Sequence, residues 1–311
     1  MKILITGGAG FIGSHLVERM VSLGHEVVVL DNLLQGNKIP EQLLPNITLH
    51  IGDVRDSALV SLCMEGVHTV YHFAAVLGVD LVADHPVETM DVEVIGTRNV
   101  VNAALEHGVQ QLFYASTSGI YSHSAIVKTA LTENVLVDPR TSYAMAKRYN
   151  EIYLASHFEE RGLNTIALRF FNVYGERQDN RMVIPRFIEQ AQNNQAITIF
   201  GNGLQTRDFT YIDDVIEACV RLQKIDGFHI VNIANEREWT INDLAYLILQ
   251  LWESEAQIKY LDAPKKRYDY EVERRIGSSE KLYELTGFKP TADLESGLLK
   301  LSLITNEKTH G

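Results

Sequence analysis

The chain has 311 residues, of which 46% are hydrophobic, and a formal net charge of −12 at pH 7. Its length suits one large α/β unit or two domains of ordinary size. The acidic excess argues against nucleic acid as a partner, because a phosphate backbone is bound by a basic surface. No apolar run approaches the ~20 residues of a membrane span, and the chain starts without a basic leader, so we expect a cytoplasmic protein with no membrane partner.

The first predicted strand, residues 2–6, runs into a glycine-rich turn that begins a helix near residues 12–23. Gly7, Gly10 and Gly13 follow the spacing G-x-x-G-x-x-G, which allows a tight turn, close backbone approach to a pyrophosphate and close packing of helix on strand. The N–H groups and dipole at the start of the helix attract an anion. The turn therefore predicts a site for a ligand that carries phosphate.

The second predicted strand, residues 26–30, ends in Asp31 and Asn32. A dinucleotide-binding fold places a carboxylate about 20 residues after its glycines, on the adenosine ribose. An acid at that position repels a 2′-phosphate. The pair of signals therefore predicts NAD as the cofactor, in preference to NADP.

Apolar strands continue to alternate with amphipathic helices up to about residue 170, which predicts βαβ units and a parallel sheet. The carboxyl ends of such strands meet at one edge, where open α/β sheets bind ligands. The loops that we expect at this edge carry Gly10, Asp31, Asp53, Ala74 and Thr117. The remaining predicted strands are 47–51, 69–73, 111–115 and 165–169, and the helices lie near 57–64, 87–107 and 143–161.

After Phe171 the glycines and prolines separate shorter elements, and arginine and amide side chains become denser. We predict an α/β fold: a Rossmann-like doubly wound parallel sheet in residues 1–171, with a smaller C-terminal α/β substrate-binding region in 172–311. A segment near 211–235, with an apolar strand at 232–234, is expected to return to the main sheet. Helices are predicted near 240–253, 278–286 and 293–304.

Cys63 and Cys219 are far apart, each in a helical segment. We expect both to be small buried hydrophobic residues in a reducing compartment, without a disulfide or a metal site.

Tyr143 and Lys147 are four residues apart on a predicted helix, hence one turn from each other on the same face. An ammonium near a phenol favours the phenolate, and an oxidised nicotinamide ring nearby adds positive charge, so the tyrosine can act as a base at neutral pH. An ordinary surface pair is the competing interpretation. The strand end Ser116-Thr117-Ser118 favours catalysis, because a hydroxyl there can share a proton with Tyr143 and a substrate.

Six motifs together resemble the extended short-chain dehydrogenase/reductases that modify nucleotide sugars, and they cover nearly the whole chain in the expected order. In chain order they are the glycine-rich start, His72-Phe73-Ala74-Ala75, Ser116-Thr117-Ser118, Tyr143-x-x-x-Lys147, Arg169-Phe170-Phe171-Asn172-Val173-Tyr174-Gly175 and the stretch from Gln205 to Val215. The resemblance implies a tightly held NAD that is reduced and reoxidised within one catalytic cycle. It also implies homodimers that pair through the helices near 87–107 and 143–161.

The resemblance assigns Tyr143 as the base that takes a proton from the sugar 4-hydroxyl, with Thr117 as a proton relay that contacts the substrate. It places Lys147 at the nicotinamide ribose, where its charge lowers the pKa of Tyr143. The further cofactor-binding residues that it implies, besides the three glycines, are Phe11 and Ile12 at the pyrophosphate, Asp31 and Asn32 at the ribose, Asp53 and Val54 at the adenine, and Ala74 near the phosphates or ribose.

For the nucleotide half of the substrate, the resemblance points to Asn172 and Arg207 at the pyrophosphate. Arg275 is expected to join them, although Arg274 stands next to it and the sequence leaves the register open. Arg181 and Arg186 are weaker candidates, and Arg181 is a candidate partner for a uronate.

The two positions after Thr117 bear on the reaction. Dehydratases of this family usually carry Asp-Glu there and UDP-uronate decarboxylases a glutamate at the second position, whereas this chain has Ser118 and Gly119. The cysteine of 3,5-epimerases is also missing, since Ile120 and Tyr121 follow. These residues favour NAD-dependent 4-epimerisation of a UDP-sugar, which needs no further acid or base.

Several alternatives remain open at this point. The sequence leaves open whether the sugar carries a 2-hydroxyl, a 2-acetamido group or the C6 carboxylate of a uronate. A UDP-glucuronate-type decarboxylase is the second hypothesis for the reaction, and a non-catalytic dinucleotide-binding sensor is the third.

Overall fold

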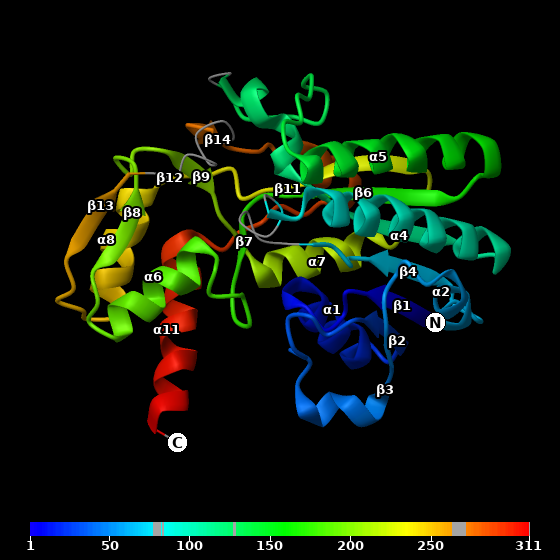
Figure 1. The fold of residues 1–311 in the computed structure, drawn as a ribbon, viewed down its shortest axis with the longest axis horizontal. Helices are drawn as coiled ribbons and strands as arrows, with labels where there is room; N and C mark the ends of the chain where they lie inside the picture. The colour runs from blue at the N-terminus through cyan, green and yellow to red at the C-terminus, as the bar shows by residue number, and fades with distance from the viewer. Residues whose placement is uncertain (77–81, 83, 127–128, 263–271, 311) are drawn as a thin grey trace. The chain divides into compact units, whose positions relative to one another are not determined.

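The computed structural model describes residues 1–76, 82, 84–126, 129–262 and 272–310. Its main sheet has seven strands in the order β11-β6-β5-β4-β1-β2-β3 (Figure 1). The bounds are β1 Lys2–Thr6, β2 Glu26–Asp31, β3 Ile47–Ile51, β4 Thr69–His72, β5 Gln111–Thr117, β6 Asn164–Phe170 and β11 Phe228–Ile233. β1 pairs in parallel with β2 and β4, β2 with β3, and β4 with β5. The predicted Rossmann-like doubly wound sheet is confirmed.

Helices cover both faces of this sheet. Both faces of its strands are therefore buried, which is why the strand sequences are continuous apolar runs. The helices are α1 Phe11–Ser22, α2 Ser57–Cys63, α4 Pro86–Glu106 and α5 Ser142–Arg161. One core holds Leu4 and Val70 of the sheet together with Val60 of α2, Val101 of α4 and Leu154 of α5. Figure 1 shows α4 and α5 side by side, and they pack directly on each other.

The strand order reverses between β1 and β4. The turn after β1 contains Gly7, and the chain after β4 continues to Ala74, so these two segments flank the reversal point. Ligands of doubly wound sheets bind in the crevice outside the strand ends at such a point. The fold therefore places the glycine turn where the sequence predicts a ligand site.

The chain divides into two compact units. The first comprises residues 1–120, 139–169 and 219–231, and the second comprises 121–138, 170–218 and 232–311. The described residues of the second unit form three small sheets, with strand orders β10-β7, β12-β9-β14 and β13-β8. Their bounds are β7 Val173–Tyr174, β8 Ile197–Phe200, β9 Thr206–Asp208, β10 Thr210–Tyr211, β12 Glu238–Thr240, β13 Ile258–Leu261 and β14 Arg274–Arg275.

The described residues also form the helices α6 Val183–Gln192, α7 Ile212–Leu222, α8 Ile241–Leu251, α10 Glu280–Thr286 and α11 Leu294–His310, and the 3-10 segments η1 Glu41–Asn46 and η2 Ser118–Ile126, the second of which is kinked at Ser122. Within the described part of the chain, no helix has the length and apolarity of a membrane span. Cys63 and Cys219 are buried free thiols, as predicted.

Candidate active site

The glycine turn after β1 has a conformation and a packing that side chains would disrupt. Gly7 has φ +70°, and a Cβ built on it would lie 2.6 Å from the Ala74 nitrogen. A Cβ on Gly13 would lie 2.2 Å from the Gly7 carbonyl oxygen, so α1 begins in direct contact with the turn. Gly7 and Gly13 are therefore required for the local fold of the protein, independently of any ligand.

Gly10 differs from these two glycines. Among the described residues, a Cβ there would meet only the Gly7 oxygen, at 3.2 Å, and the Gly10 φ of −78° suits any residue. Gly10 is the N-cap of α1, and among the described residues no side chain caps this helix end. The backbone at the start of α1 is thus left for a ligand that approaches closely, which is how a pyrophosphate binds.

The Asp31 carboxylate lies beside the glycine turn. It accepts hydrogen bonds from the backbone N–H of Ala9 at 3.0 Å and of Leu33 at 2.8 Å. Burial raises the pKa of Asp31 above its usual value, and the two N–H groups oppose that shift. The carboxylate that the sequence predicts at a ribose is held in place by the backbone.

The other predicted cofactor residues have local partners in the first unit. Asp53 binds the Arg55 guanidinium at 3.0 and 2.7 Å, and this contact lowers the pKa of the Asp53 carboxyl. The buried Val54 packs against Gly96 of α4, and Asn32 accepts a hydrogen bond from Leu34 N–H at 3.1 Å. Phe11 and Ile12 form the first turn of α1.

Thr117, Tyr143 and Lys147 come together in the first unit. Thr117 ends β5, and its hydroxyl is hydrogen-bonded to that of Tyr143 in the first turn of α5. Thr141 begins α5, because its Oγ1 accepts a hydrogen bond from Ala144 N–H at 3.0 Å. Lys147 Nζ lies 5.5 Å from the centre of the Tyr143 ring. The proximity expected from their four-residue spacing is present.

Sequence reasoning missed a carboxylate in this cluster. Glu93 of α4 lies with its Oε2 2.8 Å from Lys147 Nζ, and the two side chains are 0% and 1% exposed. Burial and the Glu93 charge raise the pKa of Tyr143, while the hydrogen bond with Thr117 lowers it. The sequence held an indication of this, because Glu93 lies on the buried face of α4, midway between the buried residues Thr89 and Thr97.

A buried chain of hydrogen bonds leads from this cluster to the end of β1. Asn150 of α5 donates through Nδ2 to the Glu93 carbonyl oxygen at 2.9 Å, and the same nitrogen lies 3.1 Å from Thr97 Oγ1. His72 links Thr97, at 3.0 Å, to Thr6, at 2.7 Å. Burial lowers the pKa of His72 to about 3, so this imidazole is neutral at pH 7.

A second buried polar group fixes α5 to the sheet. Arg169 of β6 donates from Nε and Nη2 to the Glu151 carboxylate, both at 2.8 Å, and Ser116 of β5 donates to the same carboxylate at 2.7 Å. Arg169 and Glu151 are 1% and 0% exposed. The pair therefore positions the helix of Tyr143 against the strand of Thr117.

In the second unit, two predicted arginines face each other in register. Arg275 of β14 pairs with Arg207 of β9, and burial together with the Arg207 charge lowers the pKa of Arg275 to about 9. Among the described residues, the buried Arg275 Nε has no hydrogen-bond partner. Arg274, in contrast, is paired with Glu238 at 2.8 Å. Two neighbouring cations with an unused donor form a place for an anion.

The other substrate candidates are also in this unit. Asn172 has φ +28° and donates to the Asp208 carbonyl oxygen at 2.9 Å. Arg181 is paired with Asp179 at 2.6 Å, and Arg186 lies near the Phe200 ring, 5.5 Å from its centre.

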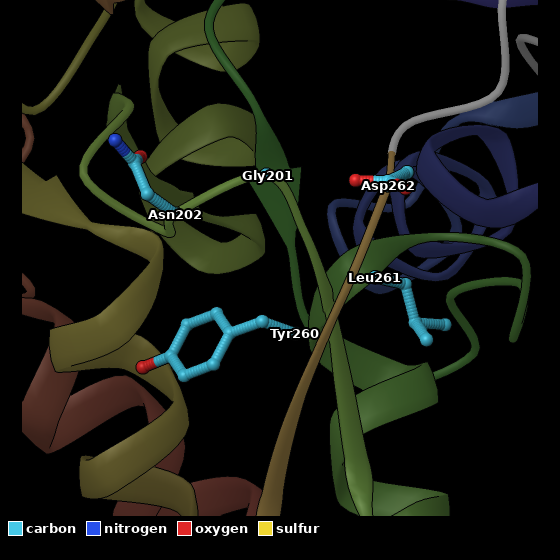
Figure 2. A pocket seen from close by; sticks show the side chains of 5 residues that line it. All are labelled: Gly201, Asn202, Tyr260, Leu261 and Asp262. Carbon is cyan, nitrogen blue, oxygen red and sulfur yellow. The ribbon is translucent and has the colours of Figure 1, made fainter.

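A pocket of about 580 Å³ opens at the ends of β8 and β13 (Figure 2). It is lined by Gly201, Asn202, Tyr260, Leu261 and Asp262. None of the predicted site residues lines it.

The model of the NAD dependent epimerase/dehydratase family matches residues 3–234. The chain belongs to this family. Membership confirms the predicted family and NAD as its cofactor. The chain is an enzyme of this family, and the names of similar proteins include both UDP-sugar and dTDP-sugar substrates and more than one reaction.

Three similar proteins show this range of reactions. The UDP-N-acetyl-alpha-D-glucosaminuronate decarboxylase of Bacillus cytotoxicus is 35% identical, over 96% of this chain and 95% of its own length. The putative UDP-glucose 4-epimerase of Methanocaldococcus jannaschii is 33% identical, over 96% of each chain. The structure of UDP-glucose 4-epimerase of Thermotoga maritima with UDP-glucose superposes with a TM-score of 0.92 at 30% identity and covers 100% of both chains.

Proposed function

We propose that this protein is an NAD-dependent 4-epimerase of a UDP-sugar. The observation that carries the proposal is the cluster of Thr117, Tyr143 and Lys147 next to Gly119, a position without a side chain. The cluster supplies what is needed to move a proton to and from a sugar hydroxyl. Gly119 offers no carboxylate to remove water or to assist loss of carbon dioxide.

In this proposal Tyr143 takes the proton of the sugar 4-hydroxyl, and Thr117 relays it through the hydrogen bond between their hydroxyls. The Lys147 ammonium stabilises the phenolate by its charge. NAD held at the glycine turn would supply a hydride acceptor for C4 and a hydride donor for the other face of the transient 4-keto sugar. Tyr143 then gives its proton back, and no net oxidation occurs.

The first unit fits NAD at the glycine turn. The uncapped start of α1 at Gly10 offers backbone donors to a pyrophosphate, and Asp31 beside it offers a carboxylate to a ribose. The carboxylate disfavours a 2′-phosphate by charge repulsion. The remaining residues that we propose for the cofactor are Gly7, Phe11, Ile12, Gly13, Asn32, Asp53, Val54, Ala74, Tyr143 and Lys147.

Gly10→Ala tests this assignment. Among the described residues, the added methyl group meets only the Gly7 oxygen, so we expect normal folding. Its clash with the pyrophosphate raises the Kd for NAD at least about tenfold. Calorimetric titration of the cofactor-free protein measures the Kd, and thermal unfolding without NAD is the control. Unchanged NAD affinity would contradict a pyrophosphate site at this turn.

We place the pyrophosphate of the UDP-sugar at Arg207 and Arg275, with Asn172 as a further contact. Support comes from the two guanidinium groups in register and the unpartnered Arg275 Nε among the described residues. Arg275 is favoured over Arg274, because Arg274 is already paired with Glu238. Residues 172–311 are accordingly proposed as the nucleotide-sugar-binding region and residues 1–171, with the segment near 211–235, as the dinucleotide-binding region.

Substitution of the two adjacent arginines distinguishes them. Arg275→Met removes a charge-assisted donor and raises the Kd for UDP about tenfold or more. The matched change Arg274→Met breaks an ion pair with Glu238 and changes the Kd less than about fivefold. Calorimetry with UDP measures the Kd of both variants. Equal losses of UDP affinity would contradict the assignment of Arg275, in preference to Arg274, to the pyrophosphate site.

The reaction is tested by incubating the protein separately with UDP-glucose, UDP-N-acetylglucosamine and UDP-glucuronate. Proton NMR of the products shows an inverted C4 signal if the protein is a 4-epimerase. Loss of the carboxyl carbon assigns decarboxylation, the activity in the name of the Bacillus cytotoxicus relative. A new C6 methyl signal assigns dehydration, and no reaction with bound NAD favours a sensor. The substrate that reacts also identifies the sugar.

We further propose a homodimer that pairs through α4 and α5. The supporting observation is a set of exposed apolar side chains on these two neighbouring helices, namely Val87, Met90, Ile95, Met145, Tyr149 and Ile152. Apolar surface of this kind marks interaction sites. Light scattering is expected to give twice the chain mass of 35.0 kDa.

A further inference from the structure

Glu93 and Lys147 form a buried ion pair next to the proposed base. Glu93 reaches from α4 and Lys147 from α5, and the 2.8 Å contact between Oε2 and Nζ is shielded from water, since neither side chain is more than 1% exposed. Lys147 Nζ also lies 4.8 Å from the centre of the Tyr114 ring and 5.5 Å from that of Tyr143. The ammonium thus sits between one carboxylate and two phenols.

Stability does not account for this carboxylate. Removing two charges from water costs about as much as their attraction returns, and apolar residues at such positions are often equally stabilising. The buried neighbours of Glu93 on α4 are uncharged: Thr89 and Thr97 lie one turn away on either side, and Gly96 is on the same face. A neutral residue would suit that face, so the charge of Glu93 calls for another explanation.

We propose that Glu93 is a positioning residue that holds the Lys147 ammonium and, by its own charge, sets the proton affinity of Tyr143. This inference rests on the proposed role of Tyr143 as the base. The Lys147 charge draws Tyr143 toward the phenolate, and the Glu93 charge cancels much of that field. Tyr143 consequently stays protonated until a further positive charge, such as an oxidised nicotinamide, is near.

The other titratable groups that face the pair do not replace Glu93. His72 of β4 is neutral at pH 7, because burial and the Lys147 charge lower its pKa to about 3. Burial and the Glu93 charge raise the pKa of Tyr114 of β5, so its phenol is neutral as well. Glu151, on the same helix as Lys147, is neutralised by its own bidentate pair with Arg169. Burial raises the pKa of the Glu93 carboxyl and the Lys147 ammonium opposes that rise. Among the described residues, Glu93 is the carboxyl group in contact with Lys147.

Glu93→Gln tests the inference because it removes the charge and keeps the size. The field of Lys147 then acts on Tyr143 uncompensated, and the acidic limb of the pH profile of kcat/KM moves down by about one pH unit or more. In NAD-free protein with ¹³Cζ-labelled tyrosine, the Tyr143 signal, assigned with Tyr143→Phe, titrates at correspondingly lower pH. The matched change Glu106→Gln, at the exposed end of the same helix, leaves both readouts unchanged.

A loss of activity without a shift of the limb, or a shift toward higher pH, would overturn the inference. The NMR titration needs no substrate, so it still decides about Glu93 if the protein turns out not to be an epimerase. If Glu93→Gln does not fold, ¹³Cδ-glutamate labelling of the unaltered protein, assigned with Glu93→Asp, replaces it. A neutral Glu93 carboxyl at pH 7 would then overturn the inference, and an ionised one supports it.

Discussion

Tyr143→Phe is expected to lower the turnover of a UDP-sugar by about a thousandfold, within the range for loss of a general acid or base. The change removes one oxygen atom, which is hydrogen-bonded to Thr117 and takes the substrate proton in the proposed reaction. Because phenylalanine keeps the ring beside Lys147, we expect the protein to fold normally and to retain NAD.

Turnover is measured by NMR of the product, and NAD content by its absorbance after denaturation. Tyr246→Phe on α8 is the control, since Tyr246 is 60% exposed and should tolerate the change without effect. Normal turnover by Tyr143→Phe would remove this residue from the role of base. Loss of NAD together with activity would instead assign Tyr143 mainly to cofactor binding.

Glu151→Leu is expected to destabilise the protein by about 3–5 kcal/mol, because it leaves the buried Arg169 guanidinium without its counter-charge. The unpaired Ser116 hydroxyl on β5 adds to the loss. Arg148→Ala removes another contact of the same carboxylate, at 3.0 Å, but Arg148 is 33% exposed. For that control we expect a loss below about 1 kcal/mol.

Urea denaturation measures both free energies of unfolding, and the double variant Glu151→Leu with Arg169→Met is expected to recover part of the loss. The pH dependence has a defined sign. The contacts with Arg169, Ser116 and Arg148 hold the pKa of Glu151 below its usual value in the folded state. Its contribution is therefore present above the pKa of the unfolded chain and is lost as the pH falls through the folded value. A contribution that grows on acidification would contradict the ion pair.

The first half of the fold could be predicted from the sequence because its strands are buried on both faces and its glycine turn is local. The predicted strands of residues 2–6 and 47–51 match β1 and β3 residue for residue, and the predicted helix 143–161 starts one residue after the start of α5. A continuous apolar run and a four-residue spacing are signals that neighbouring residues carry by themselves.

The small strands of the second unit carried no such signal. β9 and β14 have 3 and 2 residues, too few for any periodicity, yet their register places Arg275 opposite Arg207. The choice between Arg274 and Arg275 depends on this pairing between residues that are 68 positions apart in the sequence, and no local sequence pattern predicts it. The ion pair with Glu238 then distinguishes Arg274, which forms it, from Arg275.

Glu93 shows the same limit within the active site. Its residue type and its place on the inward stripe of α4 were visible, but its meaning depends on α5 packing beside α4. Only that packing turns an acidic residue in a helix into the counter-ion of Lys147.

In the proposed site, the neighbouring residues Arg207 and Arg275 also link nucleotide binding to folding. Burial, together with the Arg207 charge, lowers the pKa of Arg275, and the repulsion between the two charges opposes the native packing of β9 against β14. An anion that binds both groups relieves the repulsion in the native state and has no such site in the unfolded chain, so part of its binding energy appears as stability. In the proposed function, the nucleotide would therefore stabilise the second unit as well as anchor the substrate.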